Sequence, residues 1–181
     1  MEEVSLLGLC ASLCECIGIE PPKHAACKID SFVGAMTEGG SVERIVMFNP
    51  DAVGRWIVDR FPAKFDRVRA VAHYVQPLET VFPPKTPVCF ASMYTGAEPA
   101  VHGIQRYEKP VVKIDSIFDA LTRQGKRVAI VASKNSSLNK IFRGRDKVDY
   151  YTVKYAKEAT EKGVELIAPD MYDFILIYNQ A

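Results

Sequence analysis

The sequence predicts an α/β protein with a mostly parallel sheet that is covered by helices on both faces. Short apolar runs rich in valine and isoleucine alternate along the chain with stretches whose apolar residues recur at helical spacing. Glycine, proline and serine residues separate these segments. Parallel strands are joined by right-handed crossovers, so their carboxyl ends lie along one edge of the sheet, where α/β proteins bind their ligands.

Composition narrows the class of protein further. The chain has 181 residues, 48% of them hydrophobic and 25% charged, which suits one globular domain with a substantial core. The formal net charge of +1 gives no reason to expect a nucleic acid polymer or an anionic membrane as partner. The sequence has no apolar run of about 20 residues, and the acidic Glu2 and Glu3 are unlike a secretory signal. We therefore expect a cytoplasmic protein that does not enter a membrane.

The first part of the chain reads as a helical leader, residues 1–41, ahead of an α/β domain, residues 42–181. Within the leader, residues 4–17 predict an amphipathic helix that ends at Gly18, and residues 29–37 predict a second short helix. Three of the five cysteines fall in the first helix, without the paired CxxC spacing of structural zinc sites. We expect them to be reduced thiols packed as small apolar side chains.

The sheet is expected to begin with a buried strand, Val42–Phe48. Asp51 lies just beyond its carboxyl end, in the run Asn49-Pro50-Asp51, and could either bind a ligand or cap the next helix. That helix is predicted from apolar residues at helical spacing, Val53, Trp56, Ile57 and Phe61. A second strand is predicted over Val68–Val75, with His73 inside it as a core histidine.

The rest of the chain alternates regularly between strand and helix. Ser116 and Asp119 have the spacing of a capping box, and Ser136 or Ser137 is expected to cap the next helix. A longer helix is predicted over residues 155–167. The three later strands are predicted over residues 127–132, 148–153 and 172–178.

The most informative segment runs from Val81 to Ile104 and reads VFPPKTPVCFASMYTGAEPAVHGI. Its prolines favour extended backbone up to Thr86, which is expected to be the N-cap of a helix with Pro87 as its first residue. A hydroxyl at a helix N-terminus lies beside free N–H groups and the positive end of the helix dipole, where a phosphate or an alkoxide is stabilised. The simpler interpretation is that Thr86 only caps the helix.

This segment resembles the nucleophile segment of the nucleotide pyrophosphatase/phosphodiesterase branch of the alkaline phosphatase superfamily. Phenylalanine and proline, Lys-Thr, Thr-Gly, a proline and His-Gly-Ile follow one another at the family's intervals. Asp51, about 35 residues before Thr86, is similar to the family's first metal-ligand aspartate. The resemblance covers residues 42–179, the N-terminal half of a typical member, and implies an incomplete alkaline-phosphatase-like three-layer sandwich.

The resemblance implies a metal-dependent phosphoesterase that acts on a small phosphate ester. Thr86 would be the nucleophile and would form a phospho-threonine that water hydrolyses. Asp51 and Thr86 would share one of two divalent metal ions, which are usually zinc in this family. Cys89 stands where the phosphodiesterases tend to carry an asparagine that contacts a phosphoryl oxygen, so it is the candidate substrate-binding residue.

Two further readings remain open. The family's other metal ligands are aspartates and histidines beyond the last predicted strand, and the sequence stops at Ala181 without a histidine at such a position. A non-catalytic α/β half-domain that binds a nucleotide or a partner is therefore the alternative to a phosphoesterase that lacks its C-terminal ligands. A cysteine hydrolase that uses Cys89 is a third reading. The apolar first helix and an open sheet edge would both favour a homo-oligomer.

Overall fold

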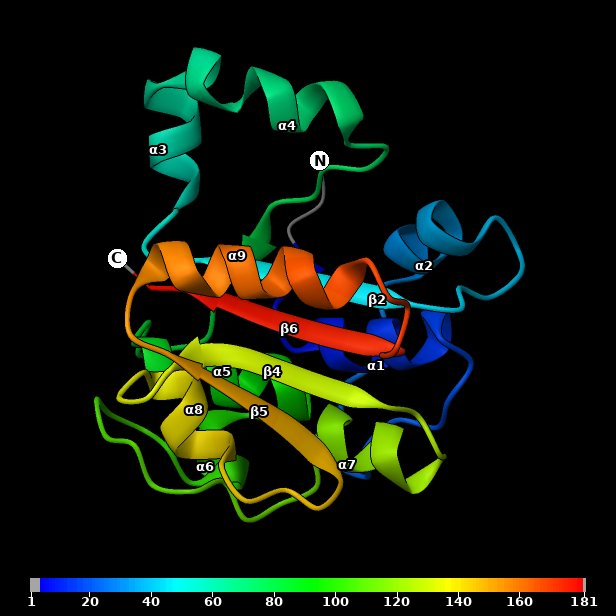
Figure 1. The fold of residues 1–181 in the computed structure, drawn as a ribbon, viewed down its shortest axis with the longest axis vertical. Helices are drawn as coiled ribbons and strands as arrows, with labels where there is room; N and C mark the ends of the chain where they lie inside the picture. The colour runs from blue at the N-terminus through cyan, green and yellow to red at the C-terminus, as the bar shows by residue number, and fades with distance from the viewer. Residues whose placement is uncertain (1–3, 181) are drawn as a thin grey trace.

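The computed structural model describes residues 4–180. Four strands form one parallel sheet in the order β2-β6-β4-β5 (Figure 1). Their bounds are Ile45–Pro50 for β2, Val128–Ser133 for β4, Val148–Val153 for β5 and Phe174–Asn179 for β6. The predicted parallel α/β class is therefore confirmed, and all four carboxyl ends lie along one edge of the sheet.

Helices cover both faces of the sheet. One face is covered by α1 (Gly8–Cys16), α5 (Thr86–Thr95), α7 (Ile117–Arg123) and α8 (Ser137–Phe142), whose apolar residues form one core cluster with the sheet. The other face is covered by α9 (Ala156–Ile167), which packs mainly on β6 and β4. Because β4 and β6 are covered on both sides, nearly all of their residues are buried.

The predicted N-terminal caps of α7 and α8 and the predicted end of α5 are confirmed. The backbone N–H of Ser116 donates to Asp119 Oδ2 at 2.8 Å, which completes the predicted capping box of α7. Ser136 Oγ accepts a hydrogen bond from the backbone N–H of Asn139 at the start of α8. Gly96 follows α5 in the left-handed conformation, with φ of 69°.

The leader is helical but differs from the prediction at its start. Val4–Ser5 is a short strand, β1, and α1 begins only at Gly8. Every residue of α1 except Glu15 is buried, so α1 is an interior helix and the prediction of an amphipathic one is wrong. The predicted second helix is present as α2 (Asp30–Thr37). Glu2 and Glu3 lie outside the described residues.

The prediction of a buried strand over Val42–Phe48 is wrong in position and in burial. The strand β2 begins at Ile45, and Val46 and Phe48 are 39% and 49% exposed. Within residues 4–180, no strand pairs with β2 on the side away from β6. Pro50 fits such an edge position because its missing N–H would interrupt a ladder inside a sheet.

The predicted strand Val68–Val75 is also wrong. Residues 53–75 form an arm that stands away from the sheet (Figure 1) and contains α3 (Arg55–Arg60), a 3-10 turn (Pro62–Phe65) and α4 (Asp66–Val71). No described strand lies beside the arm to pair with it, and an aspartate in the first turn favours a helix. His73, expected in the core, is exposed after α4.

The chain returns from the arm through β3 (Leu78–Glu79), which pairs in parallel with β1. A short helix, α6 (Pro99–His102), follows α5. Among residues 4–180, no helix has the length and apolar character needed to cross a membrane.

Candidate active site at the carboxyl edge of the sheet

Asp51 lies directly after β2 and is held by the end of the neighbouring strand β6. Its backbone N–H donates to the carbonyl oxygen of Asn179 at 2.9 Å. Its carboxylate oxygen Oδ1 accepts a hydrogen bond from the Tyr178 hydroxyl at 3.0 Å. The side chain is half-buried, and Oδ2 receives no hydrogen bond from the described residues. Asp51 is therefore fixed in place with one carboxylate oxygen left to bind a ligand.

Tyr178 connects Asp51 to the helix that carries Thr86. The tyrosine is buried in β6, and its ring meets the ring of Phe90 in α5 edge-on, with 4.8 Å between centroids. Burial, together with the neighbouring Asp51 carboxylate, raises the pKa of Tyr178 well above its ordinary value. The hydroxyl thus stays protonated and remains a hydrogen-bond donor to Asp51.

Thr86 is the first residue of α5, and Pro87 is the second. The N-cap is Lys85, so the expectation that Thr86 caps the helix by itself is wrong by one position. No side chain caps this helix, and the Thr86 hydroxyl has no hydrogen-bond partner within residues 4–180. The half-buried hydroxyl is therefore available at the positive end of the helix dipole.

A second tyrosine supports the same edge from within the core. Tyr94 of α5 is fully buried, and its hydroxyl accepts a hydrogen bond from Asn49 Nδ2 at 2.9 Å. Burial raises the pKa of Tyr94. The sequence analysis missed Tyr94 and Tyr178 as supporting residues. A signal existed for Tyr178, because a tyrosine hydroxyl near the carboxyl end of one parallel strand can reach the residue that follows the neighbouring strand.

Cys89 lies in the first turn of α5 and is half-buried. Its Sγ lies 3.2 Å from the hydroxyl oxygen of Thr80, so the thiol is engaged with a neighbouring side chain. A thiol is a weaker hydrogen-bond donor than the amide of an asparagine. Cys89 is therefore placed one turn from Thr86 on the same helix, with limited capacity to hold a phosphoryl oxygen.

The same edge carries basic side chains that the sequence analysis did not single out. An open pocket of about 460 Å³ lies at the carboxyl ends of β4 and β5. Its lining consists of Ser133, Lys134, Asn135, Thr152, Val153 and Lys154. A second pocket of about 550 Å³ shares three of these residues and extends to Lys157 and Gln180. The sequence could have pointed to this pocket, because ligands of α/β proteins bind at the carboxyl ends of the strands and both strands were predicted.

His102 is a structural histidine at the end of α6. Because Nδ1 accepts a hydrogen bond from the backbone N–H of Ile104 at 3.2 Å, Nε2 carries the proton and donates to Ser92 Oγ at 3.0 Å. Burial of the ring lowers the pKa of His102 to about 4. The fold therefore holds the neutral imidazole.

The low pKa of His102 makes the protein less stable in acid. An unfolded histidine titrates near 6.5, so the unfolded chain binds the extra proton between pH 6.5 and 4, and stability is lost as the pH falls through that window. We expect a loss of up to about 3 kcal/mol from this residue. The free energy of unfolding can be measured with urea between pH 7 and pH 4. It should fall less for His102→Asn than for the unaltered protein, and equally for the exposed control His73→Asn. Equal declines in all three proteins would contradict the assignment.

The side chains at this edge do not by themselves fit a two-metal centre. Asp51 supplies a carboxylate and Thr86 a hydroxyl, whereas zinc sites in proteins normally have three or four protein ligands. Within residues 4–180, no group of three or more histidine, cysteine, aspartate or glutamate side chains could hold a metal ion. The donor set of the described chain is therefore too small for the pair of ions that the family resemblance implies.

The arrangement of the sheet and helices identifies the fold. The parallel sheet with helices on both faces is an alkaline-phosphatase-like α/β fold, similar to the crystal structure of phosphonoacetate hydrolase from Sinorhizobium meliloti 1021 in complex with phosphonoacetate. The TM-score is 0.59 at 17% sequence identity, over 76% of this chain and 46% of that one. This chain thus spans less than half the length of that relative.

The family follows from the sequence comparison. The sequence model of the type I phosphodiesterase / nucleotide pyrophosphatase family matches residues 45–139, more than half of the chain. The protein belongs to this family, and the matched region contains both Asp51 and Thr86. A search of curated proteins finds no match.

Proposed function

We propose that the chain is the nucleophile-bearing part of a phosphoesterase that acts on a small phosphate ester. One observation carries the proposal: the family match includes Thr86, and the hydroxyl of this residue lies at the N-terminus of α5, which no side chain caps. Asp51 supports it from the end of β2, because Tyr178 links this carboxylate to α5 through Phe90.

The proposed reaction is an in-line transfer to Thr86. A bond forms between Thr86 Oγ and phosphorus, the bond from phosphorus to the leaving alcohol breaks, and the hydroxyl proton ends on the departing oxygen. Water then hydrolyses the phospho-threonine. The N-terminus of α5 offers free N–H groups and a positive dipole to the phosphoryl oxygens, and Cys89 lies one turn along the same helix.

Metal dependence is part of the proposal, but the described residues do not account for it. The family resemblance implies two divalent ions, expected to be zinc, and the chain offers only Asp51 and Thr86 as ligands. We therefore expect this chain alone to bind zinc more weakly than a Kd of about 1 µM, because complete structural sites reach about 10–16 kcal/mol of binding energy. Calorimetric titration of the chain and of Asp51→Asn would measure the contribution of Asp51.

The basic pocket favours an anionic substrate. Lys134 and Lys154 lie at the carboxyl ends of neighbouring strands, on the same edge of the sheet as Asp51. Ammonium groups at such a position bind phosphate, carboxylate or sulfate groups as point charges. The solved relative was crystallised in complex with phosphonoacetate, which is a small anion.

Replacement of Thr86 tests the nucleophile. With p-nitrophenyl phosphate and bis-p-nitrophenyl phosphate in the presence of zinc, we expect slow turnover by the chain. Thr86→Ala should reduce it at least about 10³-fold, as loss of a nucleophile typically does. Mass spectrometry after an acid quench should find a phosphoryl group on the peptide that contains Thr86. Thr122→Ala, at the opposite edge of the sheet, is the matched control.

Two results would contradict the proposal. Full turnover by Thr86→Ala would exclude Thr86 as nucleophile. Rapid turnover by the chain without any partner, lost in Thr86→Ala, would show that its own ligands suffice.

A non-catalytic half-domain is the second candidate, because the described residues contain too few metal ligands. It predicts no turnover and no phospho-threonine. It also predicts that a nucleotide still binds and that Lys134→Ala with Lys154→Ala weakens this binding.

A further inference from the structure

A pocket lies between the arm, residues 53–75, and the segment through which the chain returns to the body of the protein. Its volume is about 540 Å³. Small-molecule sites in proteins usually measure about 300–1,000 Å³. The pocket is therefore large enough for part of a small ligand.

The lining of this pocket is mainly apolar. Its apolar side chains are Val53, Val58, Val75, Pro77 and Leu78. Two charged residues of the lining, Arg55 and Asp59, pair with each other at 3.3 Å. The remaining charge is that of Arg69, which forms no ion pair among residues 4–180. The pocket therefore suits an uncharged apolar group and disfavours a cation.

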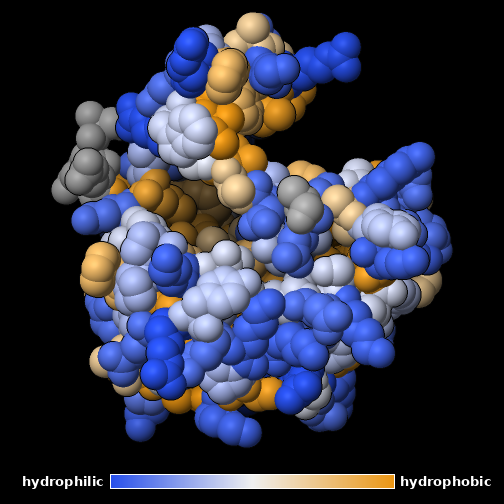
Figure 2. All heavy atoms as spheres, turned by 90° about the vertical axis from the view of Figure 1, so that its left-hand side faces the viewer, coloured by the Kyte–Doolittle hydropathy of each residue, from blue (hydrophilic) through white to orange (hydrophobic). Residues whose placement is uncertain are grey.

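One end of the pocket adjoins Asp51. Val53 follows Asp51 by two residues, so the two Cα atoms lie at most about 7 Å apart. The arrows of β4 and β6 point to the left in Figure 1, and Figure 2 views this left-hand side, with the arm at the top above a hollow with an apolar lining. The hollow thus opens on the same edge of the sheet as the candidate site.

The other end of the pocket is connected to α5. Leu78 precedes Thr80 by two residues. The hydroxyl oxygen of Thr80 lies 3.2 Å from Sγ of Cys89, which is one turn along α5 from Thr86. The chain therefore leads from one wall of the pocket to Asp51 and from the other to α5, so a phosphate ester held at Thr86 can extend its leaving group between them.

Contacts with the body of the protein hold the arm in place. The hydroxyl oxygen of Tyr74 lies 2.9 Å from Ser31 Oγ, and the tyrosine ring meets that of Phe32 in α2 edge-on, with 6.0 Å between centroids. The return segment is fixed as well, because β3 pairs with β1. The pocket is therefore largely formed before a ligand binds, which lowers the entropy cost of binding.

We propose that this pocket holds the leaving alcohol of the phosphate ester and selects an apolar, uncharged one, an aryl or alkyl alcohol. The inference rests on the proposed function, in which Thr86 attacks phosphorus. Contact with the valine and leucine side chains removes the apolar group from water and stabilises the complex. A cationic alcohol is disfavoured because Arg69 carries the uncompensated charge of the pocket.

Equilibrium binding of phosphate monoesters tests the pocket without any turnover. In calorimetric titrations without added metal, p-nitrophenyl phosphate should have a dissociation constant at least about 10-fold lower than that of methyl phosphate. Phosphocholine, whose alcohol is cationic, should bind no more tightly than methyl phosphate. Val75→Ser with Leu78→Ser should reduce the preference for p-nitrophenyl phosphate to less than about 2-fold. Val164→Ser with Ile167→Ser, which are similarly exposed on α9, is the matched control and should leave the preference unchanged.

Trp56 reports where the ligand binds. It is the one tryptophan of the sequence, and a β-carbon on Gly54, which lines the pocket, would lie 3.1 Å from its Cδ1. The p-nitrophenyl group should quench the fluorescence of Trp56 with the same midpoint as the calorimetric titration.

Circular dichroism of each variant separates loss of the pocket from loss of the fold. Equal binding of p-nitrophenyl phosphate and methyl phosphate, or no measurable binding of either, would overturn the inference. So would a preference that survives Val75→Ser with Leu78→Ser in the folded protein. Nitrobenzene that binds as tightly as p-nitrophenyl phosphate would show that the pocket is not connected to the candidate site. Failure of the proposed function is seen separately, as full turnover by Thr86→Ala, whatever the binding preference.

Discussion

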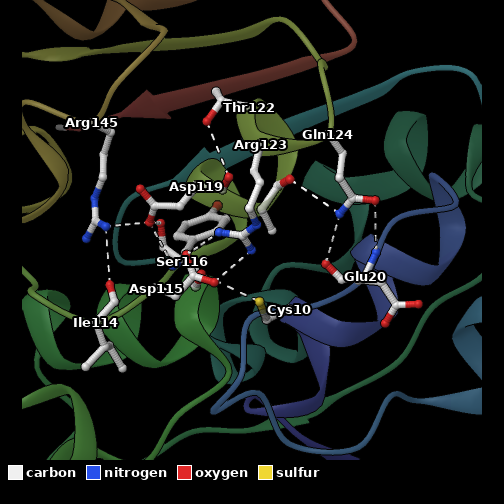
Figure 3. A network of polar contacts seen from close by, with 12 residues as sticks. Cys10, Glu20, Ile114, Asp115, Ser116, Asp119, Thr122, Arg123, Gln124 and Arg145 are labelled. Carbon is white, nitrogen blue, oxygen red and sulfur yellow. Dashed lines mark hydrogen bonds and ion pairs between the residues drawn. The ribbon is translucent and has the colours of Figure 1, made fainter.

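Replacing Arg145 by alanine is expected to lower the free energy of unfolding by about 2–4 kcal/mol, because it removes one partner of a part-buried ion pair and two further hydrogen bonds. The Arg145 side chain is only 10% exposed and pairs with the carboxylate of Asp119. Its guanidinium also donates to the carbonyl oxygens of Ile114, at 3.2 Å (Figure 3), and of Val112, at 2.7 Å. Without it, the Asp119 carboxylate and two carbonyl groups each lose a charged hydrogen-bond donor. Urea unfolding followed by circular dichroism measures the difference.

Arg145→Lys is the informative control for this substitution. Lysine keeps the positive charge but lacks the planar fork that reaches several acceptors at once. We expect it to recover part of the stability, because it can still pair with Asp119. Asp119 also accepts hydrogen bonds from the backbone N–H and the hydroxyl of Ser116, so the capping box of α7 depends on the same carboxylate. A loss below about 1 kcal/mol for Arg145→Ala would contradict this account.

Gly96→Ala is expected to destabilise the protein by about 2–5 kcal/mol. Gly96 ends α5 with φ of 69°, which an alanine adopts only with strain. A β-carbon at this position would lie 2.7 Å from Cα of Ala25 and 3.1 Å from Cβ of Cys10, so the connection after α1 would have to move. The loss should appear as a lower urea midpoint with an unchanged slope.

Gly103→Ala separates backbone strain from steric conflict. Gly103 has φ of 84°, and a β-carbon there would have no atom within 4 Å. Its loss of stability should therefore be confined to the strain, about 1–2 kcal/mol. Equal losses for the two glycines would show that the close approach of Ala25 to Gly96 contributes nothing.

The sequence predicted the second half of the fold well because local and tertiary preferences agree there. The strands β4, β5 and β6 and the helices α7, α8 and α9 follow the predicted alternation, and the capping residues of α7 and α8 are in place. Residues 68–75 were mistaken for a strand because they form a short, mostly apolar run. Such a run forms a strand only where a neighbouring strand is present to pair with it.

The candidate site was predictable only in part. Asp51 and Thr86 came from the family resemblance and from their positions at a strand end and a helix start. The link between them through Tyr178 and Phe90 depends on side-chain packing between β6 and α5, which no local pattern encodes. The exposure of Val46 and Phe48 likewise follows from the strand order, since β2 has a described neighbour on one side only.

The pairing of β2 with β6 also determines when the site can be assembled during synthesis. Ile45 is aligned with Phe174, although most of the chain lies between them in sequence. On the ribosome, Asp51 emerges long before Asn179 and Tyr178, which hold it. The segment that bears Thr86 and the β4–β5 pair can form earlier, whereas Asp51 gains its hydrogen-bond partners only once β6 has been translated.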